Sequence, residues 1–238
     1  MKKTSLILSL LSLTSIVCAQ ADLKLWYNKP AGQWVEALAI GNGRIGGMVY
    51  GGVSEERIQL NESTLYSGGP VKKSINPGSA AQLPVLRKAL LEEHDLQKAD
   101  SIARLMQGLF TESYLPLGDL VIKQDFGSAT PTEYYRDLDL QKAISTTRFM
   151  VDGVRYERSV FVSAPDNVMV LRITASKKGS LTFDLSANSQ LRYVIKPGTG
   201  NELVVSGKAP AHVDPSYYNP ENKEHIEYDP GAGCNSMR

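Results

Sequence analysis

Cysteine is almost absent from this chain of 238 residues, which contains only Cys18 and Cys234. Removal of an N-terminal leader that includes Cys18 would leave a single thiol. An internal disulfide framework is therefore excluded, and stability has to come from packing. A chain of this length can bury a sizeable core.

Charge of one sign is also lacking, because 26 Lys and Arg residues nearly balance 25 Asp and Glu residues. Such a chain has no excess of positive charge to neutralise a phosphate backbone or to hold an anionic membrane surface. We therefore expect neither nucleic acid nor a membrane as a partner.

Long apolar runs are missing except near the N-terminus. Lys2 and Lys3 precede an apolar stretch over 6–17, and a small residue, Ala19, ends the segment. This order is typical of a secretory signal peptide, and the stretch is too short to span a bilayer. We predict a signal peptide at 1–19, a mature chain over 20–238, and export to the periplasm or the extracellular space.

Short strand-like runs separated by turn signals fill the second half of the chain. They lie at 120–126, 143–151, 154–162, 168–175, 181–185, 191–195 and 203–205. This spacing predicts a mainly β protein, built as a sandwich or a barrel. The tail at 208–238 has no sustained periodicity and is predicted to be a long loop.

One hairpin is predicted together with its register. The Asp-Gly pair at 152–153 supplies the positive φ angles of a two-residue type I′ turn. The cross-strand pairs that this turn implies are Val151 with Val154, Phe149 with Tyr156, and Arg148 with Glu157.

Apolar residues at helical spacing cover 80–108, and a polar stretch interrupts them at 92–95. Asp95 can cap a second helix at this point. The segment therefore predicts a short helical pair inserted into a β domain.

The motifs that would bind a cofactor or a metal are not convincing. A G-x-G-x-x-G pattern at 41–46 is followed by further glycines, which are incompatible with the helix that a dinucleotide site needs. We interpret it as a tight turn between strands. His94, His212 and His225 lack metal-ligand spacing, and no nucleophile elbow is present. We predict no metal and no cofactor.

Carboxylates are abundant, yet sequence spacing cannot identify the pair that a glycosidase needs. Glu55 and Glu56 are interpreted as solvated surface, and Asp137 and Asp139 as exposed residues on one face of a strand. Glu62 stands out because it lies in a run of polar residues at 61–64, between Leu60 and Leu65. The cluster indicates either a hydrogen-bonded turn or a contact with a ligand.

Several motifs follow one another along the mature chain. They are LWY (25–27), EALAIGNGRIG (36–46), ERIQLNESTLYSGGP (56–70), LPLGDL (115–120), YRDLDL (135–140), GVRY (153–156) and GKAPAHV (207–213). Together they resemble the N-terminal β domain of glycoside hydrolase family 95, a family of α-L-fucosidases. Two departures are Ala39, where the family usually has Pro, and Tyr66, where it usually has Trp.

The resemblance implies the N-terminal domain of a secreted enzyme that releases terminal α-1,2-linked L-fucose by an inverting mechanism. It implies a large antiparallel β supersandwich, followed by an α/α barrel that carries the catalytic residues. We therefore expect no catalytic residue in this chain, and we expect the domain to be incomplete at its C-terminus. The expected partners are a fucosylated glycan, bound by the full-length enzyme, and the enzyme's own barrel.

Five residues are candidates for the rim of the substrate site or for an interdomain contact. They are Asn61, Glu62, Thr64, Tyr66 and His212. All five lie in segments that could be presented toward the barrel. The alternative function is a stand-alone carbohydrate-binding β-sandwich module without catalysis, because a fold does not determine a function.

Overall fold

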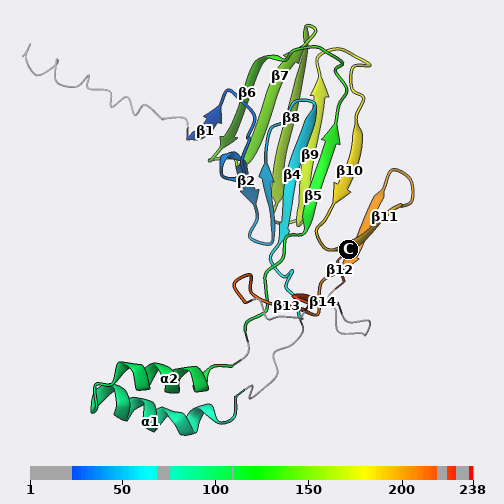
Figure 1. The fold of residues 1–238 in the computed structure, drawn as a ribbon. Coiled ribbons are helices and arrows are strands. Elements are labelled where there is room, and N and C mark those ends of the chain that lie inside the picture. Colours follow the sequence, from blue (N-terminus) through cyan, green and yellow to red (C-terminus); the bar gives the residue numbers. More distant parts are fainter. Residues whose placement is uncertain (1–22, 69–75, 109, 219–223, 229–235, 238) are drawn as a thin grey trace, which may run out of the picture.

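The computed structural model describes residues 23–68, 76–108, 110–218, 224–228 and 236–237. Two five-stranded antiparallel sheets, here called sheet 1 and sheet 2, face each other (Figure 1). This arrangement confirms the predicted mainly β fold, an antiparallel sandwich with an inserted helical pair. The predicted signal peptide at 1–19 lies outside the described residues.

Sheet 1 has the spatial order β1–β6–β7–β8–β9, and each pairing is antiparallel. Its strands are β1 (Lys24–Tyr27), β6 (Thr132–Asp139), β7 (Ile144–Val151), β8 (Val154–Ser163) and β9 (Val168–Ala175). Strands β7, β8 and β9 were expected from the sequence. The predicted runs did not include β6, although Asp137 and Asp139 were assigned to a strand, and they did not include the short edge strand β1.

The hairpin between β7 and β8 has the predicted register. Val151 pairs with Val154, and Phe149 pairs with Tyr156. Both residues of the turn at 152–153 have positive φ angles, 49° and 74°, as a type I′ turn requires. The rings of Phe149 and Tyr156 stack with their centroids 5.5 Å apart and form part of an apolar cluster at this end of the sandwich.

Sheet 2 has the spatial order β10–β5–β4–β3–β2. Its strands are β2 (Leu38–Gly41), β3 (Ile45–Val49), β4 (Glu55–Glu62), β5 (Gly118–Lys123) and β10 (Asp184–Asn188). The glycine motif at 41–46 is the tight turn that joins β2 to β3, with Gly41 opposite Gly46. The interpretation as a turn between strands is confirmed.

The main core lies between the two sheets. Leu38, Val49 and Ile58 of sheet 2 pack in one buried cluster with Leu138 and Val160 of sheet 1. These residues alternate along their strands with more exposed ones, which is the pattern of a sheet with one buried face. The apolar contact between the sheets is what holds the sandwich closed.

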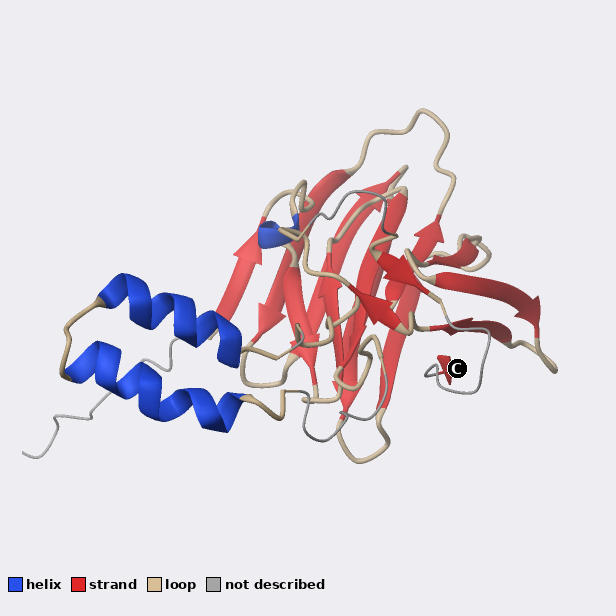
Figure 2. Cartoon of the chain, turned by 60° about the horizontal axis from the view of Figure 1, so that its bottom comes forward, coloured by secondary structure: helices blue, strands red, loops and turns tan. Residues whose placement is uncertain are grey.

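The helices α1 (Ser79–Leu91) and α2 (Leu96–Met106) form the predicted pair. As expected, the Asp95 side chain caps α2, accepting a hydrogen bond of 2.9 Å from the backbone N–H of Lys98. Figure 2 shows the two helices side by side, extending away from the sheets at one end of the molecule. In the described part of the chain, no helix has the length and apolar character needed to cross a membrane.

The prediction of a structureless loop over 208–238 is wrong in part. A small sheet contains β11 (Arg192–Pro197), β12 (Leu203–Lys208) and β15 (Ser236–Met237), and a two-stranded sheet contains β13 (His212–Val213) and β14 (Ile226–Glu227). Strands of two residues pair with segments elsewhere in the chain and leave no periodic pattern in the sequence.

A buried ionic contact connects the two sheets. Arg158 of β8 places Nη1 3.4 Å from Oε2 of Glu56 on β4, and both side chains are at most 2% exposed. The Nη2 atom of Arg158 donates to the Gln124 side chain and, at 2.7 Å, to the carbonyl of Val53. The N–H of Gly51 donates to Oε1 of Glu56 at 2.8 Å. The charge of each partner is thus shared with groups from several segments.

The interpretation of Glu56 as solvated surface is therefore wrong, because its side chain is buried against Arg158. The sequence did not reveal this contact, since the two residues are 102 positions apart. The expected exposure of Asp137 is also wrong, since this residue is 6% exposed. Burial raises the pKa of Asp137, whose carboxylate lies 3.5 Å from the hydroxyl of Tyr135.

Two further residues of β6, Tyr134 and Arg136, donate hydrogen bonds to backbone carbonyls outside the strands. The hydroxyl of Tyr134 donates to the carbonyl of Gly51, and the pKa of Tyr134 is raised, chiefly by burial. A Cβ atom at Gly51 would lie 2.6 Å from that hydroxyl, and the φ of 72° also favours glycine. Arg136 donates to the carbonyls of Lys29 and Glu36, both at 2.8 Å.

We expect Glu56→Gln to lower the free energy of unfolding by about 3–5 kcal/mol, because Arg158 would keep a buried charge without its carboxylate. Urea unfolding followed by circular dichroism measures the change. The matched control is Glu157→Gln, which breaks the exposed ion pair with Arg148 and should cost about 0–1 kcal/mol. Equal losses of stability in the two variants would contradict a stabilising role for the buried Glu56–Arg158 pair.

Candidate functional site

Three segments that are distant in the sequence meet at the end of the sandwich from which the helices extend. Backbone N–H groups donate from Ser67 to the carbonyl of Ser113 at 2.9 Å, from Gly68 to Pro210 at 3.0 Å, and from Leu115 to Leu65 at 3.0 Å. We call the segments 62–68, 112–117 and 209–214 the loop end. Buried residues of all three segments, Leu65, Leu115 and Ala209, pack with Leu191 in one apolar cluster.

The candidates Glu62 and Thr64 lie together in a turn at the loop end. Oε2 of Glu62 accepts hydrogen bonds from the N–H of Thr64 at 2.8 Å and from its hydroxyl at 2.6 Å. Oε1 accepts from Nε of Arg44 at 3.0 Å. The Thr64 hydroxyl is the main cause of a lowered pKa at Glu62. The carboxylate therefore stays ionised and holds the chain reversal that follows β4.

The candidate Tyr66 lies against a second tyrosine, Tyr114. Their rings meet edge to face, with centroids 5.2 Å apart. The hydroxyl of Tyr114 donates to the carbonyl of Glu62 at 3.1 Å, which connects this pair to the Glu62 turn. Both tyrosines are 46% exposed. Their rings thus present an apolar surface at the loop end.

The candidate His212 is held between two carboxylates. Its Nδ1 atom lies 3.1 Å from Oε1 of Glu112, and its Nε2 atom lies 2.9 Å from Oδ1 of Asp214. Hydrogen bonds to Asp214 and Glu112 raise the pKa of His212. A carboxylate facing each ring nitrogen favours the imidazolium, which donates to both.

The hydroxyl of Ser67 donates to Glu112, not to His212. Serine and histidine are therefore not arranged as a nucleophile and its base within this cluster. Sequence reasoning missed Glu112 as a partner of His212 because 100 positions separate the two. The i, i+2 spacing of His212 and Asp214 was the one local signal, because side chains two positions apart in an extended segment point to the same side.

The candidate Asn61 lies in a different feature, a shallow pocket of about 320 Å³ on the outer face of sheet 2. We call it the Asn61 pocket. Its lining residues come from the 3-10 helix η1 (Trp34–Glu36), from β4, β5 and β10, and from the segments around 114–116 and 189–190. Trp34 is 57% exposed at this pocket.

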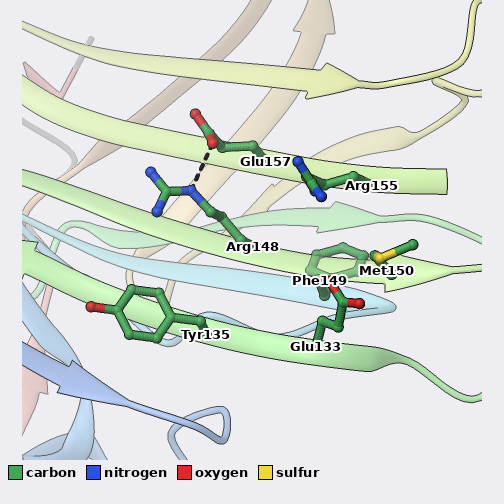
Figure 3. Close-up of a pocket in the computed structure, with 7 residues that line it drawn as sticks. All are labelled: Glu133, Tyr135, Arg148, Phe149, Met150, Arg155 and Glu157. Carbon is green, nitrogen blue, oxygen red and sulfur yellow. Dashed lines mark hydrogen bonds and ion pairs between the residues drawn. The ribbon is translucent and has the colours of Figure 1, made fainter. Parts of the chain in front are cut away.

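A second pocket, of about 420 Å³, lies on the outer face of sheet 1 (Figure 3). Its lining residues are Glu133, Tyr135, Arg148, Phe149, Met150, Arg155 and Glu157. Nε of Arg148 donates to Glu157 at 2.7 Å, so these two charges neutralise each other. Among the described residues, no group of three or more His, Cys, Asp and Glu side chains is arranged to hold a metal ion.

Comparison with known proteins adds a family match over most of the chain. Residues 25–234 match the family described as "Glycosyl hydrolase family 65, N-terminal domain". "Alpha-L-fucosidase 2" of Arabidopsis thaliana is 33% identical over 215 residues, which are 89% of this chain and 25% of the relative.

Two fungal relatives carry the name "Probable alpha-fucosidase A". The protein of Aspergillus niger is 31% identical over 176 residues, covering 69% of this chain and 22% of the relative. The protein of Aspergillus oryzae is 29% identical over 192 residues, covering 74% of this chain and 25% of the relative. The chain thus spans about a quarter of the length of these relatives.

We expect the stability of the protein to depend on pH through His212. Because its pKa is raised in the folded state, the stabilising contribution is complete below the pKa of an unfolded histidine, about 6.5, and is lost as the pH rises through the folded pKa. The Tm of the wild type should therefore fall relative to that of His212→Asn as the pH rises above about 6.5. Differential scanning calorimetry at a series of pH values measures this.

The control for this series is His94→Asn, which removes an exposed imidazole from the turn between the helices. This variant should keep the pH dependence of the wild type. If His212→Asn also kept the pH dependence of the wild-type Tm, the stabilising role of the Glu112–His212–Asp214 contact would be refuted.

We expect Glu62→Ala to destabilise the protein by about 1 kcal/mol, because the N–H and hydroxyl of Thr64 lose their acceptor. Thermal unfolding measures the loss. The matched control is Asp100→Ala, which breaks an exposed pair with Arg104 on the surface of α2 and should cost less. An unchanged Tm in Glu62→Ala would argue against the structural role of this carboxylate.

Proposed function

Because this chain belongs to the family of glycosyl hydrolase family 65 N-terminal domains, we propose that it is the N-terminal β domain of a secreted α-L-fucosidase. The full enzyme would release terminal α-1,2-linked L-fucose from a glycan by an inverting mechanism. The catalytic barrel would lie outside this chain, and the signal-peptide pattern at 1–19 supports export.

The resemblance to a glycoside hydrolase N-terminal domain is confirmed at the level of that class. The matched family carries the number 65, whereas the sequence motifs resemble family 95, and the names of the relatives fit family 95. The observation that carries the proposed activity is the match of most of this chain to proteins named as α-fucosidases in a plant and in fungi.

The carboxylates of the loop end support the placement of catalysis outside this chain. Inverting hydrolysis needs an acid and a base on opposite sides of the scissile bond, separated by enough space for water. Glu62 is instead bound to Arg44 and Thr64. Glu112 and Asp214 are both bound to His212.

Exposed aromatic side chains support an interdomain role for the loop end. Within the loop end, the rings of Tyr66 and Tyr114 contact each other. A second group of rings lies just outside its segments in the sequence, where Phe110 contacts Tyr217 and Tyr218 with centroids 6.1 and 5.0 Å apart. All five rings are more than a third exposed. Exposed apolar rings of this kind favour an interaction surface. The loop end would therefore face the catalytic domain of the same enzyme.

Release of L-fucose from 2′-fucosyllactose tests the proposal. The full-length enzyme should release fucose, and the isolated 238-residue chain should not. Proton NMR at the start of the reaction should show β-L-fucose as the first anomer, because a single displacement inverts the α-linkage.

Turnover by the 238-residue chain alone would place the chemistry in this chain and contradict the proposal. If the full-length protein released no fucose, the alternative of a carbohydrate-binding module without catalysis would be favoured. If α-L-fucose formed first, the inverting mechanism alone would be wrong.

A further inference from the structure

The side chains of the Asn61 pocket have hydrogen-bonding groups that the protein does not use. The side chains of four polar lining residues make no hydrogen bond or ion pair with any described residue: Asn61, Asp119, Asn188 and Gln190. Asn61 and Asp119 are partly buried. Asn188 and Gln190 are exposed, so the polar groups of the pocket are open to water or to a ligand.

The unused groups have a particular chemistry. Each of the three amides offers an N–H₂ donor and a carbonyl acceptor, and the Asp119 carboxylate offers acceptors alone. The lining thus offers both donors and acceptors. A hydroxyl group both donates and accepts a hydrogen bond, so a ligand with several neighbouring hydroxyls matches this lining.

Two aromatic rings complete the pocket. Trp34 is 57% exposed and makes no ring contact with another described residue, and Tyr114 is 46% exposed. Exposed rings beside polar groups provide an apolar face and a polar edge in one site. The C–H face of a sugar ring is the complementary surface.

The charge of the lining disfavours anionic ligands. Asp119 is the one charged residue among those that line the pocket. A phosphate, a nucleotide or a carboxylate would be repelled, because no cation is present to balance it. In the pocket on sheet 1, by contrast, Arg148 and Glu157 already bind each other (Figure 3).

The strands hold the polar groups in fixed positions. On sheet 2, Gln59 of β4 and Asn188 of β10 are the Cα partners of Asp119 on β5, one on each side. Gly118 has a φ of 148°, and a Cβ there would lie 2.2 Å from the carbonyl oxygen of Asn188. This glycine therefore permits the close approach of β5 and β10 at the pocket, where rigid strands place side chains accurately.

We propose that the Asn61 pocket binds one neutral sugar residue of a glycan. The ring lies against Trp34 or Tyr114, and its hydroxyls contact Asn61, Asp119, Asn188 and Gln190. A volume of about 320 Å³ is at the small end of the range for ligand sites and fits a single sugar residue.

The two tryptophans of the chain, Trp26 and Trp34, allow a direct test. The purified chain is titrated with neutral methyl glycosides of L-fucose, D-galactose, D-glucose and D-mannose, each in turn. In Trp26→Phe, the emission of Trp34 should change saturably with at least one glycoside. In Trp34→Phe, the remaining Trp26 should not respond. Glycerol at equal hydroxyl concentration controls for a general solvent effect.

A second measurement uses the wild-type chain, so that a folding defect in a variant does not decide the outcome. The indole N–H signal of Trp34 in a two-dimensional proton–nitrogen NMR spectrum, assigned with Trp34→Phe, should move on titration. Asp119→Ala should weaken binding about tenfold. The matched control Asp184→Ala removes a carboxylate at the far end of the β5–β10 pair and should bind as the wild type does.

Three results would overturn the proposal. They are a Trp34 signal that no glycoside moves, an equal response of both tryptophans to glycoside and glycerol, and equal affinities for Asp119→Ala and Asp184→Ala. None of these results bears on fucose release, so the hydrolytic proposal and the binding proposal fail independently.

Discussion

The contact between Arg158 and Glu56 is the constraint on which the arrangement of this sandwich depends. It joins β8 of sheet 1 to β4 of sheet 2 through side chains that are almost fully buried. Taking both charges out of water costs free energy that only close pairing and additional hydrogen bonds can offset. The relative position of the two strands is therefore restricted to one that keeps the pair together.

Strand β4 carries this constraint to the loop end. It begins at Glu55, beside the buried pair, and ends at Glu62, in the turn of the loop end. The distance along a strand from Glu56 to Glu62 is roughly 20 Å. Fixing the first part of β4 against β8 thus fixes where Asn61 and Glu62 stand. The carboxylate of Glu62 is hydrogen-bonded within the protein. The side chain of Asn61, by contrast, has no hydrogen-bond partner among the described residues.

Local patterns predicted local structure well. The Asp-Gly turn at 152–153 fixed the register of β7 and β8, and Asp95 marked the start of α2, because each depends on neighbours a few residues away. The burial of Glu56 depends on Arg158, which is 102 positions distant. An isolated Glu-Glu pair in the sequence looks the same whether it is solvated or buried against such a partner.

The candidate site was predicted in its parts and not in its arrangement. Glu62 and Thr64 are adjacent in the sequence and were singled out together. The partners Glu112 and Tyr114 were not, since the antiparallel approach of 112–117 to 62–68 follows from the fold. The Asn61 pocket combines residues of η1, β4, β5 and β10. These residues come together only because β10 pairs with β5 at the edge of sheet 2.

We propose that the loop end faces the catalytic domain of a larger α-L-fucosidase. Hydrogen–deuterium exchange of the isolated chain and of the full-length enzyme tests this placement. Amides at 62–68 and 209–214 should exchange more slowly in the full-length enzyme, while those of β7 and β8 should exchange at the same rate in both. Equal exchange at the loop end in the two proteins would contradict it.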